Sequence, residues 1–253
     1  MYKIGTTVRC AFAAAFVFAL VAGNSFAASI NYGNFGPVTP GVIFQGVAET
    51  STSDAVPLYG PPSPFSVGLG FNPVGFVSYS NAASSDTTKG TIDFVMSAIS
   101  SAIHMDSISV SEAGDHTFAG TGTAATTASA AMLLKATVLE INGAPVVPFN
   151  LTPVSASVVF SMPGAVTVQP WSVGGTLNVQ AQLLGLGFGA NDVATSIAIS
   201  IDNTLATTSQ ASSAASIAKK SFSVSVGVST VAPEPGSILL AACACGLMAL
   251  RRR

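Results

Sequence analysis

Alternation of apolar and small polar residues is the clearest pattern in this chain. Between Ser221 and Ser229, phenylalanine and valine occupy every even position, while serine and glycine occupy the odd ones. Residues 193–201 repeat the pattern, with valine, threonine and isoleucine at the odd positions opposite alanine and serine. Because successive side chains of a strand point to opposite faces, this period of two predicts half-buried β-strands with a hydroxyl-rich outer face.

A second local signal predicts a β-hairpin. Asn142-Gly143 separates the strand candidates 132–141 and 144–149, and this dipeptide favours the type I′ turn of two-residue hairpins. Shorter apolar runs predict six further strands, at 42–48, 75–80, 91–99, 103–110, 155–160 and 176–184.

These strands predict an all-β fold. No interior segment shows an apolar stripe at helical spacing, so we expect an antiparallel β-sandwich, either jelly-roll or immunoglobulin-like. Trp171 lacks the cysteine partners of an immunoglobulin core, which favours the jelly-roll. The rival architecture is a β-solenoid, but the chain shows no fixed-period repeat to support it.

Turn-forming residues predict the connections between the strands. The proline-rich segment Ser51–Pro64 should be a long extended loop. We expect loops, in preference to weakly specified strands, at Ala119–Ala131 and Thr207–Ser216. Asp202-Asn203 predicts a turn after its strand, and Glu112–Asp115 predicts a hairpin turn with solvent-facing acids.

The N-terminus has the three parts of a secretory signal. Lys3 and Arg9 form a basic region, Cys10–Ala22 is a short apolar run, and Ser25-Phe26-Ala27 offers small residues for cleavage. We therefore expect signal peptidase to cut after Ala27. The alternative is a retained N-terminal anchor.

The C-terminus reads as a short membrane-spanning segment. The uncharged run Gly236–Leu250 would form a helix of about 22 Å, against a hydrocarbon core of about 30 Å. Basic residues stay on the cytoplasmic side, so the tail predicts a single transmembrane helix with the preceding chain outside. The run lies between Pro233, Glu234 and Pro235 on one side and Arg251, Arg252 and Arg253 on the other.

This order of a Pro-Glu-Pro motif, a short apolar helix and an arginine cluster resembles the PEP-CTERM sorting signal of Gram-negative envelope proteins. The resemblance covers residues 233–253 only. It implies that the chain is a substrate of an exosortase, a membrane processing enzyme associated with exopolysaccharide production, which would cut near the motif. The catalytic residues of sorting then belong to that enzyme, not to this chain. The alternative is a plain tail anchor.

The chain thus divides into a signal peptide (1–27), a β-sandwich ectodomain (28–232) and a sorting signal (233–253). All three cysteines, Cys10, Cys243 and Cys245, lie outside the ectodomain, which can therefore form no disulfide or thiolate metal site. The ectodomain has ten acidic residues and four lysines. This negative balance disfavours binding to nucleic acid.

The densest polar region is the best candidate for chemistry. His104, Asp106, Glu112, Asp115 and His116 lie within thirteen residues, and imidazole and carboxylate groups from adjacent strands can hold a divalent cation. The competing interpretation, a turn with solvated acids, is preferred, so we expect no metal or other cofactor.

Other catalytic signals are weak. The chain has no Gly-x-Ser-x-Gly elbow, and 185–190 lacks the context of a phosphate-binding loop, so we expect a flexible connection there. A glycosidase would need two carboxylates at a defined separation, and the ten acidic residues allow many such pairs. An aromatic platform for sugars could be built from Tyr32, Phe35, Tyr59, Phe65, Tyr79 and Trp171, although core packing is the more common use of such residues.

The sequence favours a non-enzymatic protein exported across the inner membrane of a Gram-negative bacterium. It would be a single-pass membrane intermediate, then reach the cell surface or the extracellular polysaccharide layer. The alternative is a secreted carbohydrate-binding module or glycan hydrolase that carries the same tail. A cleft lined by acidic and aromatic residues would favour the alternative.

Overall fold

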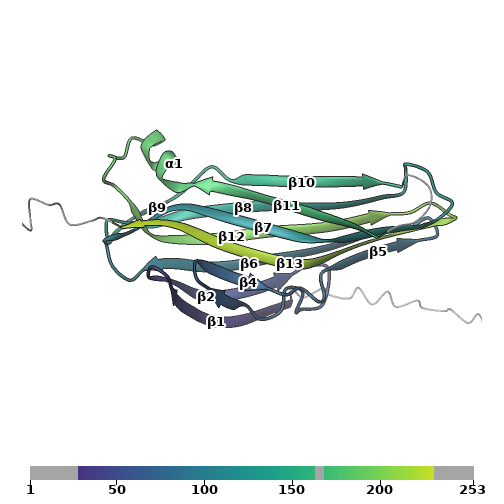
Figure 1. The fold of residues 1–253 in the computed structure, drawn as a ribbon, viewed down its shortest axis with the longest axis horizontal. Coiled ribbons are helices and arrows are strands. Elements are labelled where there is room, and N and C mark those ends of the chain that lie inside the picture. Colours follow the sequence, from purple (N-terminus) through teal and green to yellow (C-terminus); the bar gives the residue numbers. More distant parts are fainter. Residues whose placement is uncertain (1–27, 163–167, 231–253) are drawn as a thin grey trace, which may run out of the picture.

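The computed structural model of the protein describes residues 28–162 and 168–230, and these form two antiparallel β-sheets packed face to face (Figure 1). The larger sheet has seven strands in the order β1-β2-β6-β12-β8-β10, with β9 also paired to β8. Their bounds are Ala28–Val38 (β1), Val42–Ser51 (β2), Ser85–Ala98 (β6), Ala194–Thr208 (β12), Thr127–Ile141 (β8), Ala144–Asn150 (β9) and Val154–Ser161 (β10).

The smaller sheet has six strands in the order β11-β7-β13-β4-β3, with β5 also paired to β13. Their bounds are Gln169–Asn178 (β11), Ile103–Gly120 (β7), Ser213–Thr230 (β13), Gly68–Phe71 (β4), Ser63–Phe65 (β3) and Val77–Asn81 (β5). The expected all-β sandwich of antiparallel sheets is therefore confirmed.

The core lies between the sheets and follows the alternation in the sequence. Phe222 and Val224 of β13 are buried, as are Ile197, Ile199 and Ile201 of β12, while the serines between them face outward. Burial of these apolar side chains is the main source of stability in a cysteine-free sandwich.

The Asn142-Gly143 hairpin is confirmed. Both residues have positive φ, 53° and 76°, as a type I′ turn requires, and they join β8 to β9. The six shorter strand predictions overlap β2, β5, β6, β7, β10 and β11, and most of these strands extend further than predicted at one end or both. The first strand β1 and the short strands β3 and β4 were not predicted.

Two predicted turns are wrong, because the residues pair within long strands. β12 continues through Asp202-Asn203 to Thr208. The Asn203 side chain points into the core, where its Nδ2 donates a hydrogen bond to Tyr59 Oη at 2.7 Å. β7 continues through Glu112–Asp115, which pairs with both β11 and β13. The polar character of these residues reflects specific partners, not chain reversal.

The connections agree in part with expectation. Residues 52–62 contain no strand, as predicted, but Ser63–Phe65 forms β3. The loops predicted at 119–131 and 207–216 shrink to 121–126 and 209–212, because the flanking strands extend into them.

The predicted strand 176–184 is wrong in its second half, where the helix α1 (Val179–Gly185) begins. Asn178 caps this helix by accepting from Ala181 N at 2.9 Å.

No helix among the residues described is long and apolar enough to cross a membrane. The predicted cleavage site at Ala27, the sorting motif Pro233-Glu234-Pro235, the apolar run after it and the arginine cluster Arg251–Arg253 lie outside the described residues.

Candidate functional site

The polar cluster predicted around His104–His116 does not form one site. Glu112 and His116 point into the core of the sandwich, whereas His104, Asp106 and Asp115 lie partly exposed along the same strand β7. No three histidine, cysteine, aspartate or glutamate residues of the described segments gather closely enough to hold a metal ion. The register of β7 with β13 shifts between Met105 and Ser107, so even-numbered residues before and after this irregularity point to opposite faces, while Asp115 faces away from its neighbours by ordinary alternation.

Glu112 instead forms a buried ion pair. Its Oε2 lies 2.6 Å from Lys219 Nζ, and the two side chains are 1% and 0% exposed. The ammonium group also lies over three aromatic rings, with Nζ 5.3, 4.5 and 5.1 Å from the ring centres of Tyr59, Phe76 and Phe222. Burial lowers the pKa of Lys219 to about 8 and raises that of Glu112 above its ordinary value. This enclosed pair has no access for a ligand and belongs to the core.

Glu49 is a second buried acid with a structural role. It accepts hydrogen bonds from Leu58 N, from Tyr59 N at 3.3 Å and from Tyr32 Oη at 2.7 Å. Burial raises the pKa of Tyr32, and the hydrogen bond to Glu49 raises it further. The carboxylate therefore fastens the proline-rich segment 52–62 to strand β2.

The aromatic residues do not form a shared platform for sugars. Tyr59 and Trp171 are buried, and Tyr32 and Phe35 pack against the core. Only Phe65 and Tyr79 of the six are largely exposed, at 39% and 54%. The expectation that most of these residues serve packing is confirmed.

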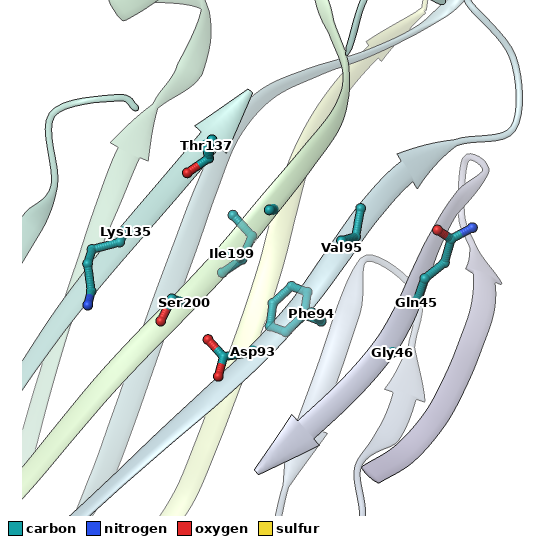
Figure 2. A pocket seen from close by; sticks show the side chains of 10 residues that line it. Gln45, Gly46, Asp93, Phe94, Val95, Lys135, Thr137, Ile199 and Ser200 are labelled. Carbon is teal, nitrogen blue, oxygen red and sulfur yellow. The ribbon is translucent and has the colours of Figure 1, made fainter. Parts of the chain in front are cut away.

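The best candidate site is a depression of about 370 Å³ on the outer face of the larger sheet, which we call the outer groove (Figure 2). It crosses four neighbouring strands, β2, β6, β12 and β8. Its lining consists of Gln45, Gly46, Asp93, Phe94, Val95, Lys135, Thr137, Ala198, Ile199 and Ser200.

Strand register places the polar groups of the outer groove in rows. Asp93, Ser200 and Lys135 occupy paired positions on β6, β12 and β8, so their side chains lie side by side across the sheet. The next row runs from Gln45 through Val95 and Ala198 to Thr137. Figure 2 shows Lys135, Ser200 and Asp93 along one side and Gln45 at the far end. The lining therefore combines hydrogen-bonding side chains with the apolar residues Phe94, Val95, Ala198 and Ile199.

A second depression of about 290 Å³ continues the outer groove. It shares Lys135, Thr137 and Ser200 with the first and extends to Asn150 and Pro153 beyond β8. Thr137 Oγ1 donates to Asn150 Oδ1 at 2.7 Å, which fixes both side chains. The combined surface crosses the strands from β2 to β9.

Of the charged side chains in and beside the outer groove, some have partners within the protein and one does not. Lys135 Nζ lies 2.6 Å from Asp202 Oδ2, and Thr91 Oγ1 donates to Asp202 Oδ1 at 2.8 Å. The Asp93 carboxylate, by contrast, makes no hydrogen bond or ion pair with the described residues. Since Asp93 pairs with Ser200, Asp202 lies at the diagonal position on β12. Diagonal positions are roughly 7–8 Å apart. Asp93 is therefore the acid free to accept hydrogen bonds from a ligand.

No protein-family model matches the sequence, and no curated protein matches it. Among solved structures, the carbohydrate-binding module TmCBM61 in complex with β-1,4-galactotriose is 10% identical, with a TM-score of 0.20 over 65% of this chain and 73% of that chain. The family 11 xylanase from Neocallimastix patriciarum is 11% identical, with a TM-score of 0.22 over 81% and 100%. A loop-swap mutant of Xyn11A from that organism is 12% identical, with a TM-score of 0.24 over the same shares. Scores this low establish neither a shared fold nor a shared ligand.

Sequence reasoning missed the outer groove. Its residues belong to four strands that are far apart along the chain, and only the register brings Asp93, Ser200 and Lys135 together. The available signal was the polar half of the alternation in 193–201, which marks the outer face of β12 but not its neighbours.

Proposed function

We propose that this protein is an exported, non-enzymatic component of the cell envelope or extracellular matrix, delivered through its C-terminal sorting signal. The observation that carries the proposal is the three-part tail: Pro233-Glu234-Pro235, the apolar run and the cluster Arg251–Arg253. The chain would pass through the inner membrane, lose its signal peptide to signal peptidase, and be held by the tail until an exosortase-type enzyme cuts it.

The boundaries of the sandwich are compatible with both cuts. Every strand described lies between residues 28 and 230, so neither expected cut falls inside one. Removal of residues 1–27 and of the tail would leave every described strand intact. The sandwich also lacks cysteine, so its stability rests on packing and not on the redox state of the compartment.

Intact-mass measurement of the surface form tests the sorting step. In a host that has the processing enzyme, we expect a mass that lacks residues 1–27 and the residues after the cut near Pro233. In a host without the enzyme, the tail should remain attached. A variant with Pro233→Ala and Pro235→Ala should retain the tail in both hosts. A mature surface form that still contains Arg253 in the first host would contradict the proposal.

The outer groove favours a second candidate function, which is binding of a polysaccharide. Its hydroxyl, amide and carboxylate groups, interspersed with apolar residues, suit a hydroxyl-rich chain laid across the strands. The free carboxylate of Asp93 would repel uronic acids, so the ligand class is a neutral glycan. Exposed aromatic rings are absent from the lining of the two depressions, which predicts weak binding.

A glycan array, followed by affinity electrophoresis in neutral polysaccharides, tests this second function. We expect retardation of the wild-type protein and loss of it in Asp93→Ala. Ser223→Ala, on the hydroxyl face of the smaller sheet, is the matched control and should bind normally. Release of reducing sugar that depends on Asp93 and Asp202 would indicate a hydrolase instead. No retardation in any glycan would leave the groove without a sugar-binding role.

A further inference from the structure

The open edges of the two sheets differ in how well they are protected. An edge strand presents unpaired N–H and C=O groups that can pair with another chain, and proteins block such edges with proline, charge, bulges or short strands. Six described strands have one open side: β1, β3, β5, β9, β10 and β11.

Four of these edges carry clear blocks. β3 has three residues and contains Pro64. β9 contains Pro145 and Pro148, which lack N–H donors. In the short strand β5, Tyr79 N already donates to Asp86 Oδ2 at 2.8 Å. β11 contains Pro170 and a pair of adjacent glycines, which weaken strand pairing.

The long edge β1 is blocked by its shape. Gly33 and Gly36 have φ of 88° and 106°, and the pairing with β2 shifts register three times. A strand bent in this way does not offer a straight row of donors and acceptors.

β10 has none of these protections. Its sequence, Val-Ser-Ala-Ser-Val-Val-Phe-Ser, contains no proline, glycine or charge, and all eight residues pair with β8 in unbroken register. Val159 projects outward and is 66% exposed. The strand also packs on the opposite sheet, where Phe160 on its inner face stacks on His116 with ring centres 3.8 Å apart. In Figure 1, β10 runs along the upper margin of the sandwich.

We propose that two copies of this chain join edge to edge through antiparallel pairing of β10, which continues the larger sheet across a two-fold axis. Directly opposite residues of antiparallel strands point to the same face. An axis through Ser157 or Val158, in the middle of the strand, places that one residue opposite its own equivalent. Every other residue then lies opposite a different residue of the same face, such as Ser155 opposite Val159 for an axis through Ser157. β10 carries no charge, so no like charges meet when the strand pairs with its own copy.

The same reasoning predicts a closed dimer. A two-fold pairing uses the same edge on both copies, and β10 is the single unprotected edge among the described strands. No second edge remains free to continue growth into a fibre. This inference does not depend on the sorting or the glycan-binding proposals.

Chemical cross-linking of the full chain tests the pairing directly. In a background with Cys10, Cys243 and Cys245 replaced by serine, Ser157→Cys supplies one reactive thiol at the axis. We expect a short bis-maleimide to convert most of this variant into a covalent dimer. Val147→Cys is the control, since Val147 is 88% exposed but lies on the proline-blocked strand β9. Equal cross-linking of the two variants, or coupling of Ser157→Cys to a different protein, would overturn the proposal.

Sedimentation equilibrium of the full chain in detergent gives an independent measure. We expect a dimer whose dissociation constant rises at least tenfold in Ser157→Lys, because two ammonium groups then meet at the axis. Ser172→Lys, at an exposed position of the blocked strand β11, should associate like the wild type. Circular dichroism should be the same for both variants, since both serines are exposed. A monomeric wild-type protein, or equal dissociation constants for the two variants, would refute edge pairing.

Discussion

Two lysine–carboxylate pairs of this sandwich have the same separation and opposite surroundings. Lys135 Nζ lies 2.6 Å from Asp202 Oδ2 on the outer face, where the side chains are 47% and 39% exposed. Lys219 Nζ lies 2.6 Å from Glu112 Oε2 in the core, where they are 0% and 1% exposed. The distance between the nitrogen and the oxygen therefore does not indicate how much each ion pair contributes to the stability of the fold. Water screens the first pair, whereas the second pair has only its own members and aromatic rings to replace lost hydration.

A bulge explains how a lysine enters the core. The register of β13 with β7 shifts between Lys219 and Ser221, which leaves Lys219 pointing inward and Lys220 outward. Lys219 N also donates to Phe76 O at 3.0 Å, in the gap between β5 and β4. The backbone is thus fixed where the charged side chain is buried.

Removing one member of the buried pair should have the largest effect. Lys219→Met leaves Glu112 without a partner in an apolar site and should lower the free energy of unfolding by about 3–5 kcal/mol. Urea denaturation measures this change. Lys220→Met is the control, because Lys220 is 62% exposed and lies 3.9 Å from Asp115. A loss below about 1 kcal/mol for Lys219→Met would mean that the buried pair resembles the surface one.

Removing both members should restore the stability. The double variant Lys219→Met/Glu112→Leu buries no charge, and we expect it to equal the wild type or exceed it by about 1–4 kcal/mol. The double-mutant cycle, measured by urea denaturation, gives the coupling of the pair. If the losses of the two single variants simply add, the two side chains do not act as a pair.

His116 is a third buried ionisable residue, and its burial predicts that the stability of the protein depends on pH. Burial lowers its pKa from the ordinary value of 6.5. Below that value the unfolded chain takes up a proton that the folded chain does not, so the free energy of unfolding should fall as the pH falls. The slope from this residue is at most about 1.4 kcal/mol per pH unit.

His116→Phe should remove this component while it keeps a ring against Phe160. Thermal or urea denaturation between pH 7 and pH 5 measures the difference between the two proteins. If the difference in the free energy of unfolding between the two proteins were the same at pH 7 and at pH 5, burial of His116 would not contribute to the pH dependence of stability.

Breaking the surface pair should have the smallest effect. Lys135→Ala should change the free energy of unfolding by at most about 1 kcal/mol. The change should shrink further in molar salt, because salt screens exposed charges. Urea denaturation at two salt concentrations measures both effects. A loss as large as that of Lys219→Met would contradict the contrast between the pairs.

The fold was largely predictable because local patterns carry it. The alternation around Phe222 and around Ile197–Ile201 identifies buried strand faces, and Asn142-Gly143 identifies a hairpin. Polar residues inside long strands were misread as turns, at Glu112–Asp115 and at Asp202-Asn203. Both segments find partners on strands distant in sequence, and local reasoning has no access to such partners.

The sequence by itself determined the all-β class, the positions of most long strands, the absence of cysteine between residues 28 and 232, and the expectation of a sorted tail. Only the tertiary structure decided that Lys219 and Glu112 meet in the core, that Asp93, Ser200 and Lys135 share one row, and that β10 is an open edge. The physical reason is the distance along the chain over which each interaction acts. Side-chain alternation and turn chemistry act between neighbours along the chain, whereas strand order and register are set by burial of the whole sheet.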